Sequence, residues 1–224
     1  METLREWLYP LGFLSSLMFG TRVLVQWMTS EVKRKSVVPN LFWKLSLAGN
    51  SLLFLHSLIQ FQFHVCLIQA CNGVISWRNL NLMGPSSERA SFDRVVQAFG
   101  VAIGGTTLFF LVHSLFFASG EWFRIPIVPG LSHFHEPIPF YWHAIGFVGL
   151  ALFNSRFWVQ WWHAEKEQKS RLDTTFWWLS LAGDLICLLY FLRIQDPVNL
   201  VGPALGVIPY IRNLILIRRN EPST

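Results

Sequence analysis

Residues 42–49, Phe-Trp-Lys-Leu-Ser-Leu-Ala-Gly, return as residues 176–183, Phe-Trp-Trp-Leu-Ser-Leu-Ala-Gly, with one position changed. The similarity extends without a gap on both sides. Residues 12–80 align with residues 146–214 at a constant offset of 134 positions, and about a third of the aligned positions are identical. A repeat of this length is too long for the unit of a solenoid. The chain is therefore an internal duplication, and we expect two copies of a small helical bundle.

Other short segments also occur at matching positions in the two copies. They are Arg22 with Arg156, Val25-Gln26-Trp27 with Val159-Gln160-Trp161, Glu31 with Glu165, Lys35-Ser36 with Lys169-Ser170, and Arg78-Asn79-Leu80 with Arg212-Asn213-Leu214. These pairs define which residues of the two repeats are equivalent.

The composition is typical of a protein that lies in a lipid bilayer. The chain is 52% hydrophobic and 16% aromatic, and its 14% of charged residues is well below the roughly one quarter found in soluble domains. Apolar runs near the length of about 20 residues that a membrane-spanning helix needs occur at about residues 7–28, 41–60, 63–82, 95–118, 140–162, 174–193 and 197–217. We therefore predict an all-α polytopic membrane protein with seven transmembrane helices. The first run lacks a basic n-region and a cleavage pattern, so we expect a retained span and not a signal peptide.

The number of spans determines how the repeats are oriented. Three spans per repeat is an odd number, so two directly joined copies would be inverted relative to each other. The extra span at 95–118 restores the same orientation and gives a 3+1+3 plan with parallel repeats. The predicted divisions are a first triple-helix repeat at 1–82, a linker helix and external loop at 83–139, and a second triple-helix repeat at 140–224.

The net charge of +5 is interpreted as a topology signal, and no nucleic-acid partner is expected. Basic residues in cytoplasmic loops outnumber those outside. In the seven-span plan only Arg5, Arg124 and Arg193 lie on one side. The other side carries Lys33, Arg34, Lys35, Arg89, Arg94, Lys166, Lys169, Arg171, Arg218 and Arg219. This distribution predicts that the N-terminus is outside and the C-terminus is cytoplasmic.

Metal, cofactor and catalytic patterns are weak in this chain. Cys66, Cys71 and Cys187 lie in predicted spans without metal-ligand spacing, so we interpret them as packing residues. The segment 133–136, His-Phe-His-Glu, is interpreted as a polar interfacial loop in preference to a metal site. No nucleophile with a base, catalytic carboxylate pair or glycine-rich phosphate loop is recognisable, so catalysis is not supported and an enzyme is only the third interpretation. We expect no metal and no cofactor.

The shared motifs resemble a known family. The order Arg-x-x-Val-Gln-Trp, a basic loop ending in Lys-Ser, Phe-Trp-x-Leu-Ser-x-x-Gly and then Arg-Asn-Leu is similar to the lipid-A biosynthesis N-terminal domain family, and both halves carry it. This family is distantly similar to the PQ-loop transporters, including the SWEET proteins and the KDEL receptor, which are also built as 3+1+3 helices. The Pro-Gln dipeptide of those proteins is Val25-Gln26 and Val159-Gln160 here.

The resemblance also implies a cellular context. The family takes its name from occurrences fused ahead of the glycosyltransferase that makes the lipid-A disaccharide, which implies a bacterial inner membrane and a role in lipid-A biosynthesis. The transferase itself is not recognisable in this chain, so disaccharide synthase activity is expected to belong to such a fusion partner.

Polar residues inside the predicted spans are the candidate binding residues, because burying them in a bilayer is costly. Arg22 and Arg156 each have a glutamine four residues later on the same helix face. Two quasi-equivalent clusters follow: Arg22, Gln26, Trp27, Arg78 and Asn79, and Arg156, Gln160, Trp161, Arg212 and Asn213. Arginine forks match phosphate geometry, which predicts a site for an anionic head group. In the alternative, the arginines extend to lipid phosphates at the membrane surface, and the tryptophans belong to aromatic belts.

Asp184 is the other candidate, near the middle of the sixth predicted span and equivalent to Asn50. A carboxylate there needs a partner or a proton. It is predicted either to pair with an arginine such as Arg156 or Arg212, or to be a protonation site coupled to transport.

Together these features predict a membrane protein that binds or transports an anionic, lipid-linked or sugar-phosphate molecule. Its expected partners are membrane lipids, an anionic glycolipid among them. The alternative is a membrane anchor or scaffold that recruits a glycosyltransferase such as lipid-A-disaccharide synthase and transports nothing.

Overall fold

The computed structural model describes residues 8, 10–117, 122, 139–193 and 197–220. The segment 133–136, interpreted from the sequence as a polar loop in preference to a metal site, lies outside these residues. No group of three or more His, Cys, Asp or Glu side chains that could hold a metal ion occurs within the described ranges.

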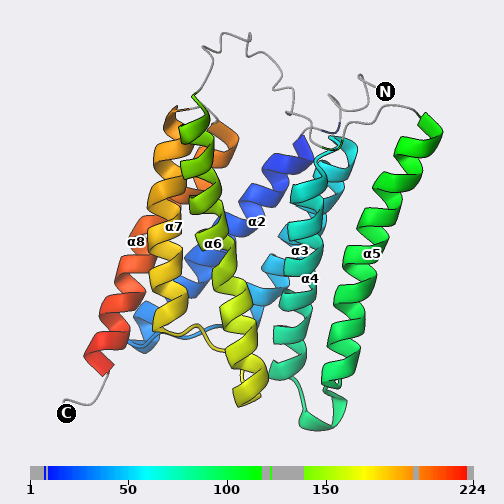
Figure 1. Cartoon of the computed structure of the whole chain (residues 1–224). Helices are drawn as coiled ribbons and strands as arrows, with labels where there is room; N and C mark the ends of the chain where they lie inside the picture. The colour runs from blue at the N-terminus through cyan, green and yellow to red at the C-terminus, as the bar shows by residue number, and fades with distance from the viewer. Residues whose placement is uncertain (1–7, 9, 118–121, 123–138, 194–196, 221–224) are drawn as a thin grey trace.

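The described chain is all helical, as the sequence predicts, with seven long helices and one short 3-10 turn (Figure 1). The elements are α2 (Pro10–Lys33), α3 (Asn40–Ile59), α4 (Phe63–Met83), η1 (Ser86–Glu88), α5 (Phe92–Phe117), α6 (Phe140–Glu167), α7 (Thr174–Arg193) and α8 (Pro197–Asn220).

Local sequence explains where several of these helices begin. Pro39 and Pro139 directly precede α3 and α6, where a missing N–H costs nothing because the first helical N–H groups have no partner inside the helix. At the start of α7 the Asp173 carboxylate accepts the backbone N–H of Phe176 at 2.9 Å, which is the role of an N-cap side chain.

The middle helix of each repeat contacts both of its neighbours. In the first repeat α3 packs against α2 and α4, and in the second α7 packs against α6 and α8. The helix α5 packs against α4 at one edge of the molecule (Figure 1). Between the repeats, α2 contacts α8 and α4 contacts α6. The first helix of each repeat therefore meets the third helix of the other.

Glycine lets α6 and α7 approach very closely. A Cβ atom placed on Gly183 would lie 2.5 Å from the backbone nitrogen of Phe153. At the equivalent position, a Cβ on Gly49 would meet the ring of Phe19 at 2.6 Å. The first contact is with backbone and the second with a side chain that can rotate, so the two glycines are not equally restricted.

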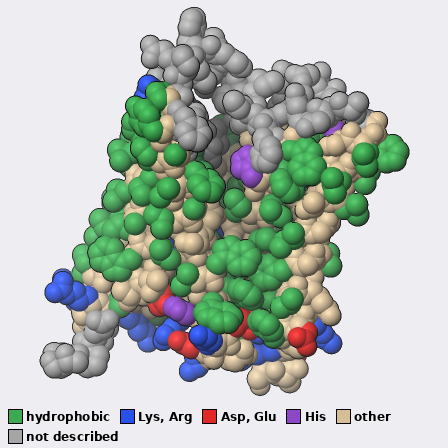
Figure 2. Space-filling model, viewed as in Figure 1, with side chains coloured by type: hydrophobic (Ala, Val, Ile, Leu, Met, Phe, Trp, Pro, Cys, Tyr) green, Lys and Arg blue, Asp and Glu red, His purple; other side chains and the backbone are tan. Residues whose placement is uncertain are grey.

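The distribution of polarity differs from that of most water-soluble domains. Arg22, Arg78, Arg156 and Asp184 are buried, whereas large apolar side chains cover the flanks and charged side chains gather at one end of the molecule (Figure 2). The apolar side chains that are more than half exposed include Phe13, Leu17, Met28, Val101, Leu115, Phe116, Phe147, Leu189 and Ile208. By length and composition, two described helices could cross a membrane: α5 over Phe92–Phe116 and α7 over Thr174–Arg193.

A candidate anion-binding site between the repeats

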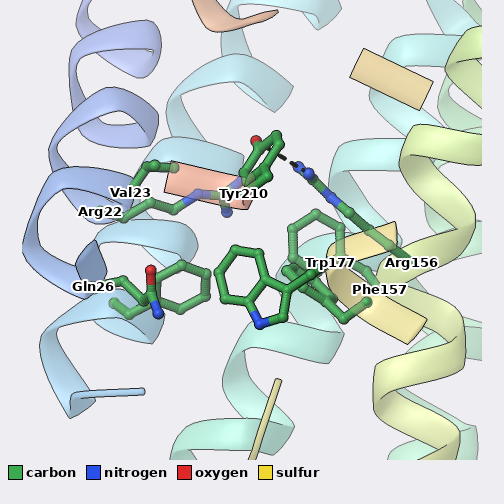
Figure 3. Close-up of a pocket in the computed structure, with 9 residues that line it drawn as sticks. Arg22, Val23, Gln26, Arg156, Phe157, Trp177 and Tyr210 are labelled. Atoms are coloured by element: carbon green, nitrogen blue, oxygen red, sulfur yellow. Dashed lines mark hydrogen bonds between the residues drawn. The ribbon is translucent and has the colours of Figure 1, made fainter. Parts of the chain in front are cut away.

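A pocket lies where the two repeats meet (Figure 3). Both repeats contribute to it, through α2 and α3 from the first and α6, α7 and α8 from the second. Its lining residues are Arg22, Val23, Gln26, Phe42, Arg156, Phe157, Phe176, Trp177 and Tyr210.

Among the described lining residues, two equivalent arginines are the only ones with charged side chains. Both are buried, Arg22 on α2 and Arg156 on α6. Arg22 donates from Nη1 to the Ser46 hydroxyl at 2.9 Å, and Arg156 donates from Nη1 to the Tyr210 hydroxyl at 3.2 Å. The Nε–H of each arginine has no hydrogen-bond acceptor, and neither guanidinium is paired with a carboxylate among the described residues. Each arginine therefore retains donor capacity.

Aromatic rings surround both guanidinium groups. The ring of Phe157 is shared, with its centroid 5.2 Å from Cζ of Arg22 and 4.8 Å from Cζ of Arg156. Phe19 lies 4.6 Å from Arg22, and Phe153 lies 3.5 Å from Arg156. Cation–π contacts of this kind recover part of the lost hydration energy, but they do not remove the repulsion between two like charges. An anion between the arginines would be attracted by both, and a phosphate matches the fork of N–H groups.

Toward the charged end of the molecule, the repeats exchange two matched sets of amide hydrogen bonds. Gln26 and Asn213 bond reciprocally at 2.8 and 3.0 Å, and the equivalent pair, Gln160 and Asn79, bonds at 2.6 and 3.0 Å. Each of these asparagines also accepts a hydrogen bond from a serine that precedes the second helix of the opposite repeat. Ser36 donates to Asn213 at 2.9 Å, and Ser170 donates to Asn79 at 2.6 Å. We call these contacts, together with the ion pairs described next, the repeat interface.

Two equivalent ion pairs complete the repeat interface. Arg78 on α4 forms a bidentate pair with Glu165 on α6, at 2.6 and 2.7 Å. Arg212 on α8 forms the matching pair with Glu31 on α2, through Nε with Oε1 and through Nη2 with Oε2 at 2.8 Å. The two arginines predicted to bind an anion at the helix ends are therefore already engaged with carboxylates of the opposite repeat.

A tryptophan one turn earlier holds each of these glutamates. Trp27 donates its indole N–H to Glu31 at 3.1 Å, and Trp161 donates to Glu165 at 3.0 Å. The hydrogen bonds from Arg212 hold the pKa of the Glu31 carboxyl below its ordinary value. These tryptophans thus hold interface carboxylates through hydrogen bonds.

Asp184 is completely buried in the second repeat, and neither carboxylate oxygen has a hydrogen-bond partner in the part of the chain that the structure describes. Arg156 is the cation whose charge acts on it, whereas Arg212 is occupied by Glu31. The equivalent Asn50 instead donates to the hydroxyl of Ser76 at 3.1 Å. The two repeats therefore differ at this position.

The structure thus divides the residues singled out in the sequence into three groups. Arg22, Gln26 and Arg156 line the pocket. Arg78, Asn79, Gln160, Arg212 and Asn213 lie in the repeat interface, where Gln26 also takes part, and Trp27 and Trp161 brace it. Asp184 belongs neither to the pocket lining nor to the repeat interface. The interface partners Ser36, Ser170, Glu31 and Glu165 were not predicted as site residues, although their recurrence in both repeats was the available signal.

Comparison with known proteins places the chain in a family. It matches the lipid A biosynthesis N-terminal domain twice, over residues 11–81 and 145–215, so the chain belongs to this family and carries two copies of its domain. It is also similar to proteins named lipid-A-disaccharide synthase: 38% identical to that of Chlamydia felis over 96% of the chain, and 37% identical to that of Chlamydia pneumoniae over 97%. The chain spans about a third of their length, 34% in both cases. No solved structure matches it.

Proposed function

We propose that this chain is a membrane-embedded unit of lipid A biosynthesis that binds the phosphate-bearing head group of an anionic glycolipid or sugar phosphate between its two repeats. The observation that carries the proposal is the pocket lined by Arg22 and Arg156, two buried cations that have free N–H donors and, within the described ranges, no carboxylate partner. Their side chains are enclosed by protein, which favours this role over contact with lipid phosphates at the membrane surface. The family and the relatives named lipid-A-disaccharide synthase supply the pathway.

Embedding of all seven helices in a bilayer, in the 3+1+3 plan with divisions at 1–82, 83–139 and 140–224, is part of this proposal. The exposed apolar flanks support it, since a water-soluble monomer rarely exposes large continuous apolar surface. Polar residues such as Arg22 on α2 and Arg78 on α4 lower the mean hydropathy of their helices, but these side chains are buried against protein. They would therefore not face lipid.

The proposed topology places the charged end of the molecule in the cytoplasm of a bacterial inner membrane. A reporter active only in the cytoplasm should be active when fused after Arg94 or after Arg219, and inactive when inserted at about Gly130, because basic loops are retained on the cytoplasmic side. The opposite pattern would reverse the orientation. Activity at all three positions would contradict the proposed number of spans.

Arginine-to-lysine substitution tests the pocket. Lysine keeps the charge but loses the planar fork, so Arg22→Lys and Arg156→Lys should each reduce the anionic phospholipid or glycolipid that copurifies with the full chain by about tenfold, the effect of losing about one charge-assisted hydrogen bond. Mass spectrometry of lipid extracts, normalised to protein, measures this. Arg171→Lys is the matched control, because Arg171 is exposed and pairs with Glu167. An unchanged amount of copurified lipid in the double Arg22→Lys, Arg156→Lys variant would contradict the proposal.

Transport of the bound group is the further step of the proposal. It requires the two repeats to move relative to one another, and the repeat interface would have to open on one side. The similarity to PQ-loop transporters remains a prediction. Uptake of a bound lipid or sugar phosphate into proteoliposomes, compared between the wild-type chain and the double lysine variant, tests this step separately from binding.

The second candidate function is a membrane anchor for a glycosyltransferase. It is favoured by the lengths of the relatives, because the matched region makes up only 34% of proteins named lipid-A-disaccharide synthase. An anchor would retain a synthase during purification whether or not the pocket is intact. Copurification of the synthase with the double lysine variant, together with unchanged lipid, would favour the anchor.

A further inference from the structure

The charges buried near the pocket do not balance. Arg22 and Arg156 bring two positive charges to the pocket. Among the described residues, Asp184 is the only fully buried carboxylate, and it lies about two turns along α7 from the pocket-lining Trp177. The other acidic side chains buried or half-buried in the repeat interface, Glu31 and Glu165, are each paired with their own arginine. With Asp184 ionised, the protein around the pocket therefore carries one uncompensated positive charge.

The fold itself does not require a carboxylate at this position. In the first repeat the equivalent residue is Asn50, which bonds to Ser76 and forms a closed neutral pair. In the second repeat Tyr210 replaces that serine, and its hydroxyl accepts a hydrogen bond from Arg156 instead. Asp184 is fully buried and has no hydrogen-bond partner among the residues that the structure describes. Burying a carboxylate in this way is costly unless a charge compensates it.

We propose that Asp184 sets the charge of the ligand, so that the pocket accepts a singly charged phosphate group, as in a phosphodiester, in preference to a doubly charged phosphate monoester. This inference rests on the proposed function, because it assumes that the anion binds between Arg22 and Arg156. In a low-dielectric interior, an excess or missing unit charge near the site changes the binding free energy strongly. A monoanion would leave the site neutral, whereas a dianion would leave one negative charge uncompensated.

The test compares two probes on the full-length purified chain at pH 8. Diphenyl phosphate is a monoanion, and phenyl phosphate is a dianion at this pH because its second pKa is near 6. The wild-type chain should prefer the diester. Asp184→Asn should shift the ratio of the two dissociation constants toward the monoester by about tenfold or more. Because the same probes are used for each variant, their difference in size cancels from the comparison.

Asn50→Asp is the matched opposite variant. It adds a carboxylate at the equivalent position of the first repeat, so it should weaken the binding of both probes and shift the ratio further toward the diester.

A second experiment uses nanodiscs that contain phosphatidylglycerol or phosphatidic acid and measures retained lipid by native mass spectrometry. If binding is seen only in nanodiscs, the ligand is a lipid head group. If the soluble probes compete with the lipid, the site also accepts a free phosphate ester. With either source, the preference for a singly charged phosphate group is supported if the ratio of the dissociation constants for the monoanion and the dianion shifts as described.

The outcomes separate this inference from the proposed function. If binding depends on Arg22 and Arg156 but Asp184→Asn leaves the probe ratio unchanged, the role of Asp184 is wrong and the pocket stands. A wild-type chain that binds neither the soluble probes nor either lipid overturns both. Thermal unfolding of each variant is measured alongside, and a shifted ratio counts as support only if the unfolding midpoint shows a folded protein.

Discussion

Replacement of Glu165 by alanine is expected to destabilise the protein by about 3–5 kcal/mol, the cost of leaving a buried charge without its partner. Glu165 forms two hydrogen bonds with Arg78, and the two side chains are only 7% and 2% exposed. Without the carboxylate, the Arg78 guanidinium would remain between the repeats with no compensating charge. The free energy of unfolding in a fixed lipid or detergent, obtained from denaturant titration, measures the loss.

The chain supplies its own control for this experiment. Glu31 is equivalent to Glu165 and pairs with Arg212 in the same geometry, but these side chains are 35% and 32% exposed. Solvent can therefore replace much of the lost interaction, and Glu31→Ala should cost clearly less than Glu165→Ala. Equal losses from the two variants would show that burial does not decide the strength of these pairs.

Replacement of Gly183 by alanine is the second large effect that we expect. The new Cβ would lie 2.5 Å from the Phe153 backbone nitrogen, so α6 and α7 would have to separate. Overpacking of this kind costs about 1–3 kcal/mol, and more where backbone must move. The helix propensity of alanine offsets only about 1 kcal/mol of it. Thermal or denaturant unfolding of the purified variant measures the net change.

Two other glycine-to-alanine variants serve as controls for this result. At Gly49 the added Cβ meets the ring of Phe19, which can rotate, so Gly49→Ala should be milder than Gly183→Ala. A Cβ added at Gly20 on α2 would meet no neighbouring atom of the described residues within 4 Å, so alanine there should stabilise the protein by about 0.5–1 kcal/mol. If Gly183→Ala were as stable as Gly20→Ala, the close approach of α6 and α7 would be contradicted.

The helices and the duplication could be predicted because their signals are local or repeated. Each apolar run marks a helix to within a few residues, and the fixed offset between the repeats identifies equivalent positions. The partners across the repeat interface could not be predicted in the same way. Gln26 and Asn213 are 187 positions apart, and Arg78 and Glu165 are 87 apart, so no periodicity connects them.

The same limit applies to the candidate site. The sequence predicted one polar cluster in each repeat, because Arg22 and Arg78 belong to one copy and Arg156 and Arg212 to the other. The structure instead brings Arg22 and Arg156 to one pocket, and it uses Arg78 and Arg212 to join the repeats. The sequence could show which polar residues are costly to bury, but the choice between a ligand and a protein carboxylate as their partner depends on tertiary packing.

The crossed pairing of the helices has a consequence for how such a protein could arise. Each repeat presents Gln and Glu on its first helix and Arg and Asn on its third, and these are the groups that the opposite repeat requires. A single repeat therefore contains both halves of the contact. Two separate copies could form the same surface as an isologous dimer with twofold symmetry. In the present chain α5 connects the two halves covalently, which leaves each free to diverge, as Asn50 and Asp184 have done.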